Sequence, residues 1–168
     1  MPTRRPRRSP LTIVAALAAV AAGCGDGPTA PTTRRLPSGV ELSVAVTPAR
    51  PRAGEPVALT VHVRNPTADT LHVTSTCSLV AMLQVRRADG REVPELSVSA
   101  CLDLMLPLRL APGADVGYTV PDPTYASPDN VVRLPAGAYV ARATSLLGPD
   151  MSAGSGSAPF VERRFTVR

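Results

Sequence analysis

Histidine, serine and carboxylate side chains are the residue types in this chain that could do chemistry. The two histidines are considered first, because their spacing could place two metal ligands together. His62 and His72 flank a turn-forming stretch that runs from Asn65 to Asp69. If that turn closes a hairpin, the two imidazoles lie as near cross-strand neighbours on the outward face, and they supply two of the ligands that a zinc site needs. No third ligand is evident nearby, although Asp69 is close in sequence. We therefore predict two solvated histidines, with no metal and no cofactor.

The stretches that carry serine and aspartate do not match catalytic patterns. Residues 153–157 set serines among glycines, but they do not form a G-x-S-x-G nucleophile motif and are typical of a flexible loop. Asp122 and Asp129 are separated by prolines, and their spacing does not match a calcium-binding loop. The sequence therefore predicts a protein that is not an enzyme and has no catalytic residue.

The first 23 residues have the zones of a secretory signal. Four arginines before residue 9 give a positively charged start, and an apolar stretch of 12 residues follows at 11–22. That stretch is shorter than the roughly 20 apolar residues that a permanent membrane span needs. Once residues 1–23 are removed, 14 arginines face 13 acidic residues, and no basic run with interleaved aromatic residues remains. This balance excludes nucleic acid as a partner.

Cys24 directly follows the apolar stretch. The stretch 20–24 reads VAAGC and resembles the lipobox of bacterial lipoproteins, with Ala21 at the position where leucine is most common. The resemblance implies a signal peptide over 1–23, cleavage before Cys24, and a lipid on this cysteine. The lipid would anchor the protein in the cell envelope, on the extracytoplasmic side of a bacterial membrane. The alternatives are an ordinary signal peptide with an incidental cysteine, an uncleaved anchor, and twin-arginine export.

The other two cysteines, Cys77 and Cys101, are predicted to form a disulfide bond. An exported protein enters an oxidising compartment, where two remaining thiols usually pair. Their separation of 24 residues would close a loop that stabilises the fold by about 3 kcal/mol. Two buried thiols are the alternative.

Residues 24–39 are predicted to be a flexible tether. They are rich in Gly, Pro and Thr, and Leu36 is their only large apolar residue, so they can bury little surface. The predicted folded domain therefore spans residues 40–168.

Short segments of alternating apolar and polar residues, separated by turn residues, fill this domain. No segment has a sustained helical period, and turn signals recur every eight to twelve residues. One of them, Asp89-Gly90, is a strong hairpin signal. Seven or eight strands with one buried face predict an all-β, immunoglobulin-like antiparallel β-sandwich, with an up-and-down barrel as the alternative. Tyr139 is expected to be a buried ring whose hydroxyl bonds to the backbone at a corner of the sandwich, and Tyr118 is a second candidate for this role.

The order of several motifs resembles a known family. The motifs are LTVHVRNPT at 59–67, LHVTS at 71–75, RADGREV at 87–93, LAPG at 110–113 and LPAGAY at 134–139. Over roughly residues 56–147, this series resembles the immunoglobulin-like domain of BsuPI-type proteinase inhibitors. The resemblance implies an immunoglobulin-like sandwich and, for the namesake, inhibition of a cytoplasmic serine proteinase. This chain departs from the family pattern in its export signal and its two domain cysteines.

Binding is expected to reside in three long loops, at 94–104, 121–133 and 148–159. Tyr125 lies among prolines in the middle loop, and a rigid amphipathic ring of this kind often anchors an interface. We predict an envelope-anchored monomer whose sandwich is a non-catalytic protein-binding or structural module, with an envelope protein or a proteinase as partner. The alternative is a surface proteinase inhibitor of BsuPI type.

Overall fold

The structure is a computed structural model that describes residues 32–98, 102, 104–122, 131–151 and 158–168, so Cys24 lies outside it. The described residues form nine strands, listed here in chain order: β1 (Thr32–Arg35), β2 (Glu41–Thr47), β3 (Ala58–Arg64), β4 (Leu71–Ser75), β5 (Ala81–Arg87), β6 (Leu106–Leu110), β7 (Asp115–Val120), β8 (Gly137–Ser145) and β9 (Phe160–Val167). They also form the 3-10 turn η1 (Pro94–Leu96) and the one-turn helix α1 (Gly148–Met151). No helix in these segments is long and apolar enough to cross a membrane.

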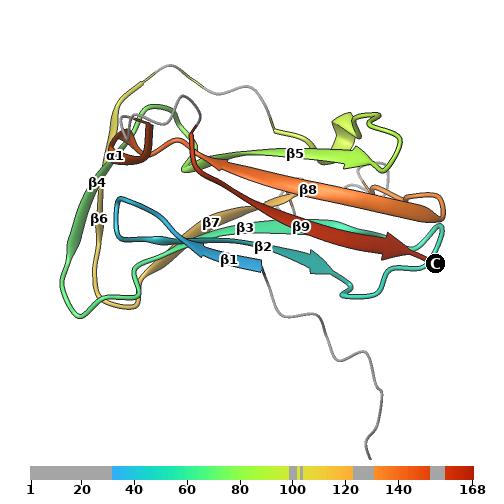
Figure 1. The fold of residues 1–168 in the computed structure, drawn as a ribbon, viewed down its shortest axis with the longest axis horizontal. Coiled ribbons are helices and arrows are strands. Elements are labelled where there is room, and N and C mark those ends of the chain that lie inside the picture. The colour runs from blue at the N-terminus through green and yellow to red at the C-terminus, as the bar shows by residue number, and fades with distance from the viewer. Residues whose placement is uncertain (1–31, 99–101, 103, 123–130, 152–157) are drawn as a thin grey trace, which may run out of the picture.

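The strands build two stacked antiparallel sheets. One sheet has the order β1-β2-β3-β7 and the other has the order β5-β8-β9, and Figure 1 shows them as two layers. The third sheet pairs β4 with β6 and lies across one end of the two layers (Figure 1). The predicted all-β antiparallel sandwich is confirmed. An up-and-down barrel is excluded because β3 pairs with β7 and β5 pairs with β8, whereas barrel strands of that kind pair with their sequence neighbours.

Alternation of apolar and polar residues decides which face of each strand is buried. Side chains with no exposed surface come from both layers, among them Leu42, Leu59, Val61, Leu83 and Val85. Their positions are two residues apart within a strand, so the residues between them point outward to solvent. Each of the two main sheets therefore has an inner apolar face and an outer polar face.

The chain bends after β3 instead of folding back as a hairpin. Asn65, which is fully buried, donates from its amide nitrogen to the carbonyl oxygens of Asp69 at 2.7 Å, Leu110 at 2.9 Å and Ala111 at 3.2 Å. Its Oδ1 accepts a hydrogen bond from the Thr67 backbone N–H at 2.9 Å. The side chain therefore fastens the bend to the connection between β6 and β7, and β4 pairs with β6 rather than with β3.

The predicted tether boundary at residue 39 is wrong, because the folded domain begins at least as early as Thr32. Strand β1 pairs along its length with β2, and Leu36 is only 4% exposed. Ser38 donates from its backbone N–H and its hydroxyl to the buried carboxylate of Asp150, at 2.9 and 3.1 Å, and the Ser145 hydroxyl donates to Asp150 at 2.6 Å. The added strand β1 gives nine described strands rather than the predicted seven or eight. The helical turns η1 and α1 span only three and four residues, in agreement with the lack of a sustained helical period in the sequence.

Two adjacent residues of β7 fix the position of this edge strand, one by a hydrogen bond to the other sheet and one by its lack of a side chain. The Tyr118 hydroxyl donates to the Ala81 carbonyl oxygen at 2.8 Å, which ties β7 of one sheet to β5 of the other. Burial raises the pKa of Tyr118 above its usual value of 10.0. Next to it, a Cβ at Gly117 would overlap the carbonyl oxygen of Val61, so β7 can lie at this distance from β3 only with glycine there.

Candidate functional site

A cleft of about 940 Å³ opens at the end of the sandwich where β5 ends and β8 begins. Two of the three predicted binding loops meet there, because residues 94–95 and the described ends of loop 121–133 line the cleft. The third loop follows β8 at the opposite end, about 26 Å away along a nine-residue strand. Tyr125, the predicted contact residue, lies outside the described residues.

One wall of the cleft is fastened by backbone hydrogen bonds to the loop before β3. The Val57 N–H donates to the Val132 carbonyl at 2.9 Å, and the Gly54 N–H donates to the Leu134 carbonyl at 3.1 Å. The Arg133 guanidinium donates to the Gly54 carbonyl at 2.6 Å. This wall is therefore fixed even though it lies in a connection between strands.

The opposite wall is the turn that follows β5. The predicted Asp89-Gly90 hairpin signal is confirmed, because the Arg87 N–H donates to the Arg91 carbonyl at 2.8 Å and the Asp89 carboxylate accepts from the Arg91 N–H at 3.0 Å. The Val93 N–H continues the pairing by donating to the Val85 carbonyl at 2.8 Å. The chain beyond the turn therefore runs back along β5 as an ordered edge.

Tyr139 is among the residues that line the cleft, and its predicted role at a corner of the sandwich is confirmed. The residue is only 1% exposed, and its ring stacks on that of Phe165, with 5.4 Å between ring centroids. Its hydroxyl donates to the Pro135 carbonyl at 2.8 Å, four residues upstream, which is the geometry of a tyrosine corner in a β-sandwich. The Arg87 guanidinium lies 5.9 Å from the ring centroid. The Tyr139 hydroxyl thus fastens the 131–135 wall, and Arg87, at the start of the opposite wall, lies beside the ring.

The cleft surface combines balanced charge with apolar side chains. Three arginines and three acids line it, namely Arg87, Arg91, Arg133, Glu92, Glu95 and Asp122. Between them lie apolar residues that include Val93, Pro121, Val131, Val132 and Pro135. An extended polypeptide presents apolar and charged groups of both signs, so a cleft of this composition matches it better than it matches a uniformly charged ligand. No group of three or more His, Cys, Asp or Glu that could hold a metal occurs in the described part of the chain.

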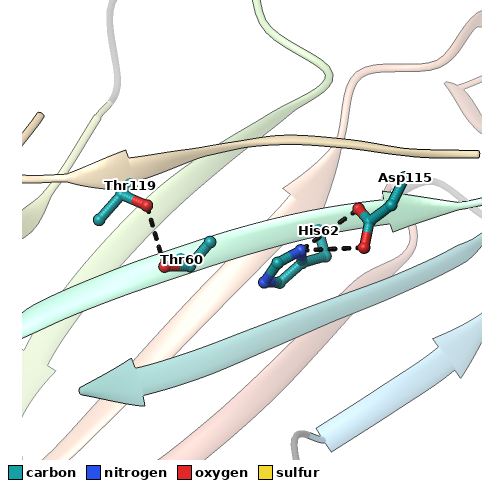
Figure 2. Close-up of polar contacts among 4 residues, drawn as sticks. All are labelled: Thr60, His62, Asp115 and Thr119. Atoms are coloured by element: carbon teal, nitrogen blue, oxygen red, sulfur yellow. Dashed lines mark hydrogen bonds and ion pairs between the residues drawn. The ribbon is translucent and has the colours of Figure 1, made fainter. Parts of the chain in front are cut away.

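A second polar cluster lies on the outer face of the four-stranded sheet (Figure 2). The His62 Nδ1 atom lies 3.2 Å from both carboxylate oxygens of Asp115, and the hydroxyls of Thr60 and Thr119 are 3.0 Å apart. Both contacts join β3 to the edge strand β7. Ser43 lies opposite His62 in β2, which sets three residue types of an acyl-transfer triad on neighbouring strands. However, the described contacts of Ser43 include no hydrogen bond to His62, and a nucleophile needs that bond to its base.

The two histidines are not cross-strand neighbours, so that prediction is wrong. His62 lies opposite Gly117 of β7, and His72 lies opposite Arg109 of β6. The bend at Asn65 separates the two strands that a hairpin would have paired. The histidine that has a carboxylate partner, His62, finds it in Asp115, a residue far away in sequence that local spacing could not indicate.

Of the three cysteines, only Cys77 lies within the described residues, where it is 1% exposed. Its neighbour Ser78 makes two hydrogen bonds with Leu102, one from the Ser78 N–H to the Leu102 carbonyl and one from the Leu102 N–H to the Ser78 hydroxyl, both at 3.2 Å. These hydrogen bonds place Ser78 and Leu102, the chain neighbours of Cys77 and Cys101, beside each other. Cys101 lies outside the described residues, so the pairing stays a prediction.

Comparison with known proteins gives little further information. No family model matches the chain, and no curated protein matches it. Among solved structures, the chain is similar to a β-glucosidase, EmGH1, from Erythrobacter marinus, with 16% sequence identity and a TM-score of 0.35. The match covers 74% of this chain, which spans only 15% of the length of the glucosidase. A likeness this weak carries no argument about function.

Proposed function

We propose that this chain is an envelope-anchored bacterial lipoprotein whose single β-sandwich, of immunoglobulin-like type, is a non-catalytic protein-binding module. Delivery to the envelope is supported by the basic start, the short apolar stretch at 11–22 and the lipobox-like residues before Cys24. Binding is supported by the cleft at the end of the sandwich, and this cleft is the observation that carries the proposal.

The cleft suits a protein partner because its walls are held before any partner arrives. The 131–135 wall is bonded to the loop before β3, and the Asp89-Gly90 turn closes the other wall. Binding then costs little ordering of these two walls, which leaves more of the contact energy as affinity. The partner that fits best is an extended segment of an envelope protein.

Lipid attachment is tested by metabolic labelling with a radioactive fatty acid. The full chain should incorporate label and fractionate with membranes, whereas Cys24→Ser should incorporate none. Equal labelling of both chains, or no labelling of either, would contradict the anchoring half of the proposal.

The cleft is tested by placing a photo-crosslinking amino acid at Glu92, which lines it, and at Arg109 on β6 as a control at the other end of the sandwich. We expect an adduct with one envelope protein from position 92 and none from position 109. Adding Arg91→Glu should remove the adduct, because it reverses a charge in the cleft. Adducts that form equally from both positions would contradict the cleft as the binding surface.

A surface proteinase inhibitor of BsuPI type is the second candidate, and the order of motifs over residues 56–147 favours it. In that case the protein should reduce the activity of a serine proteinase linearly to zero at one-to-one stoichiometry. Steady cleavage of the chain by the proteinase, with no loss of proteinase activity, would exclude the inhibitor.

A further inference from the structure

A smaller hollow lies on the outer face of the three-stranded sheet, beside the cleft. It measures about 250 Å³. The turn residues Ala88 and Gly90 line one end of it, and the lining side chains on the sheet are those of Gln84, Arg86, Arg87, Val140, Arg142 and Glu162. The strand register explains its position. The central strand β8 places Val140 opposite Arg86, while Arg142 lies opposite Gln84 on one side and Glu162 on the other. A short side chain at the centre, surrounded by longer ones, leaves the hollow.

Positive charge exceeds negative charge around this hollow. Three arginines line it, and its one lining carboxylate, Glu162, is already bound by Arg142 through Nε at 2.9 Å and Nη2 at 2.6 Å. Arg164 adds a fourth guanidinium in the row of Val140. Asp89 lies 3.9 Å from the Nε atoms of both Arg87 and Arg91, so among the arginines that line the hollow it offsets the charge of Arg87 alone. The four ion pairs found among the described residues include neither Arg86 nor Arg164.

The guanidinium of Arg142 is held in one orientation. It stacks over the Phe160 ring at 4.1 Å from the centroid, and Glu162 binds it through Nε and Nη2. Its Nη1 donors make none of these contacts. An arginine fixed by a ring on its face and a carboxylate on one edge can offer its remaining N–H groups to an oxyanion at little entropic cost.

We infer that this hollow is a binding site for a phosphate-type anion. A volume of about 250 Å³ is below the range of drug-sized ligand sites but is ample for a tetrahedral oxyanion. Guanidinium groups bind phosphate oxygens through paired N–H donors, and several arginines around one hollow suit a doubly charged anion better than a carboxylate. The Gln84 amide supplies a neutral donor. The same chemistry serves a free phosphate ester or a phospholipid headgroup, and the inference does not depend on the cleft.

The test is an NMR titration of the full chain carrying Cys24→Ser, with three soluble probes: inorganic phosphate, glycerol 3-phosphate and dihexanoyl phosphatidylglycerol. Saturable shifts of the Ala88 and Val140 amides, weakened by 0.5 M NaCl, are expected with at least one probe. Binding of the first two probes identifies a free phosphate ester as the ligand, and binding of the lipid analogue alone identifies a headgroup. No saturable shift with any of the three overturns the inference.

Measuring the affinity of substituted proteins for the probe distinguishes binding in the hollow from a general attraction of anions to a basic protein. Arg86→Gln and Arg142→Gln should each weaken binding roughly tenfold, the loss of a charge-assisted contact. Glu162→Gln should strengthen it several-fold, because it removes the one carboxylate in the hollow while the amide oxygen of glutamine can still accept from Arg142. Arg64→Gln makes the same charge change on the opposite face and should leave binding unchanged. If Arg64→Gln weakens binding as much as Arg86→Gln does, the inference is wrong. Arg86 is exposed, so Arg86→Gln should fold, and its comparison with Arg64→Gln remains valid even if Arg142→Gln fails to fold.

Discussion

The two outer faces of the sandwich differ in how their charges are arranged. On the four-stranded sheet, one row of cross-strand neighbours reads Arg35, Glu41, Arg64 and Asp115, so the signs alternate. On the three-stranded sheet, the row through Val140 has Arg86 on one side and Arg164 on the other, with no acid between them. One face neutralises itself, and the other has surplus positive charge.

The difference indicates different roles for the two faces. Opposite charges that are cross-strand neighbours stabilise a sheet slightly. Positive charges without an acidic neighbour create a positive potential that attracts an anion from solvent. The four-stranded face also carries the His62–Asp115 and Thr60–Thr119 contacts between β3 and β7. Substitutions on that face should therefore change stability, and substitutions on the three-stranded face should change binding.

The largest effect should come from Gly117→Ala, which breaks the four-stranded face at its edge. Because the added Cβ would overlap the Val61 carbonyl, β7 must shift away from β3, and the free energy of unfolding should fall by about 3 kcal/mol in urea denaturation. Gly148→Ala is the control, since its Cβ would lie 3.4 Å from the Thr74 carbonyl. Equal losses in the two variants would show that β7 is not held by this close approach.

Tyr118→Phe should sever the hydrogen bond that links the two sheets at the Ala81 carbonyl and cost about 1 kcal/mol. It should also change the dependence of stability on pH. Since folding raises the pKa of Tyr118 above 10.0, the hydroxyl ionises first in the unfolded chain. The contribution of Tyr118 is therefore complete below about pH 10 and is lost as the pH rises further.

The measurement is the free energy of unfolding in urea at pH 8 and at pH 10.5 for wild type and Tyr118→Phe. Wild type should lose more stability between the two values than the variant does. Parallel curves would mean that Tyr118 is not protected from ionisation in the folded state.

Glu41→Arg should give the four-stranded face three adjacent arginines in one row, so that its charges no longer alternate. Repulsion of the introduced guanidinium by its two cross-strand neighbours, Arg35 and Arg64, should lower the free energy of unfolding by up to about 1 kcal/mol at low salt. The loss should shrink in 0.5 M NaCl, because salt screens exposed charges. A loss that is the same at both salt concentrations would rule out the electrostatic explanation.

The smallest effect on stability is expected from Arg86→Gln, on the other face. Its side chain is exposed and makes no ion pair among the described residues, so the free energy of unfolding should change by less than about 0.5 kcal/mol. Thermal and urea unfolding provide the check. A loss well above 1 kcal/mol would mean that Arg86 supports the fold, and the two faces would then not differ in role.

Local patterns predicted the parts of the fold that depend on neighbouring residues. Alternation predicted seven or eight strands where nine are described, and Asp89-Gly90 and Tyr139 were correctly placed at a hairpin and at a corner. The strand that it did not predict is β1, Thr32–Arg35, whose polar residues have no apolar alternation. Backbone hydrogen bonds to β2 order this edge strand, and such bonds leave little trace in side-chain composition.

The binding surfaces could not be predicted in the same way. Residues 94–95 and 131–135 are far apart in the chain, and only the packing of β5 beside β8 brings them to one cleft. Arg86 and Arg142 likewise meet only through the register of those two strands. Taken singly along the chain, each of these arginines looks like an ordinary solvated side chain.

By itself, the sequence determined which side of each strand faces inward, because successive side chains of a strand point to opposite faces and only one parity is apolar. It also determined where the chain must turn, through Gly and Pro at the strand ends. Only the tertiary structure decided which strands pair. Pairing joins distant segments through backbone groups that every residue carries, so His62 has Asp115 as its neighbour rather than His72.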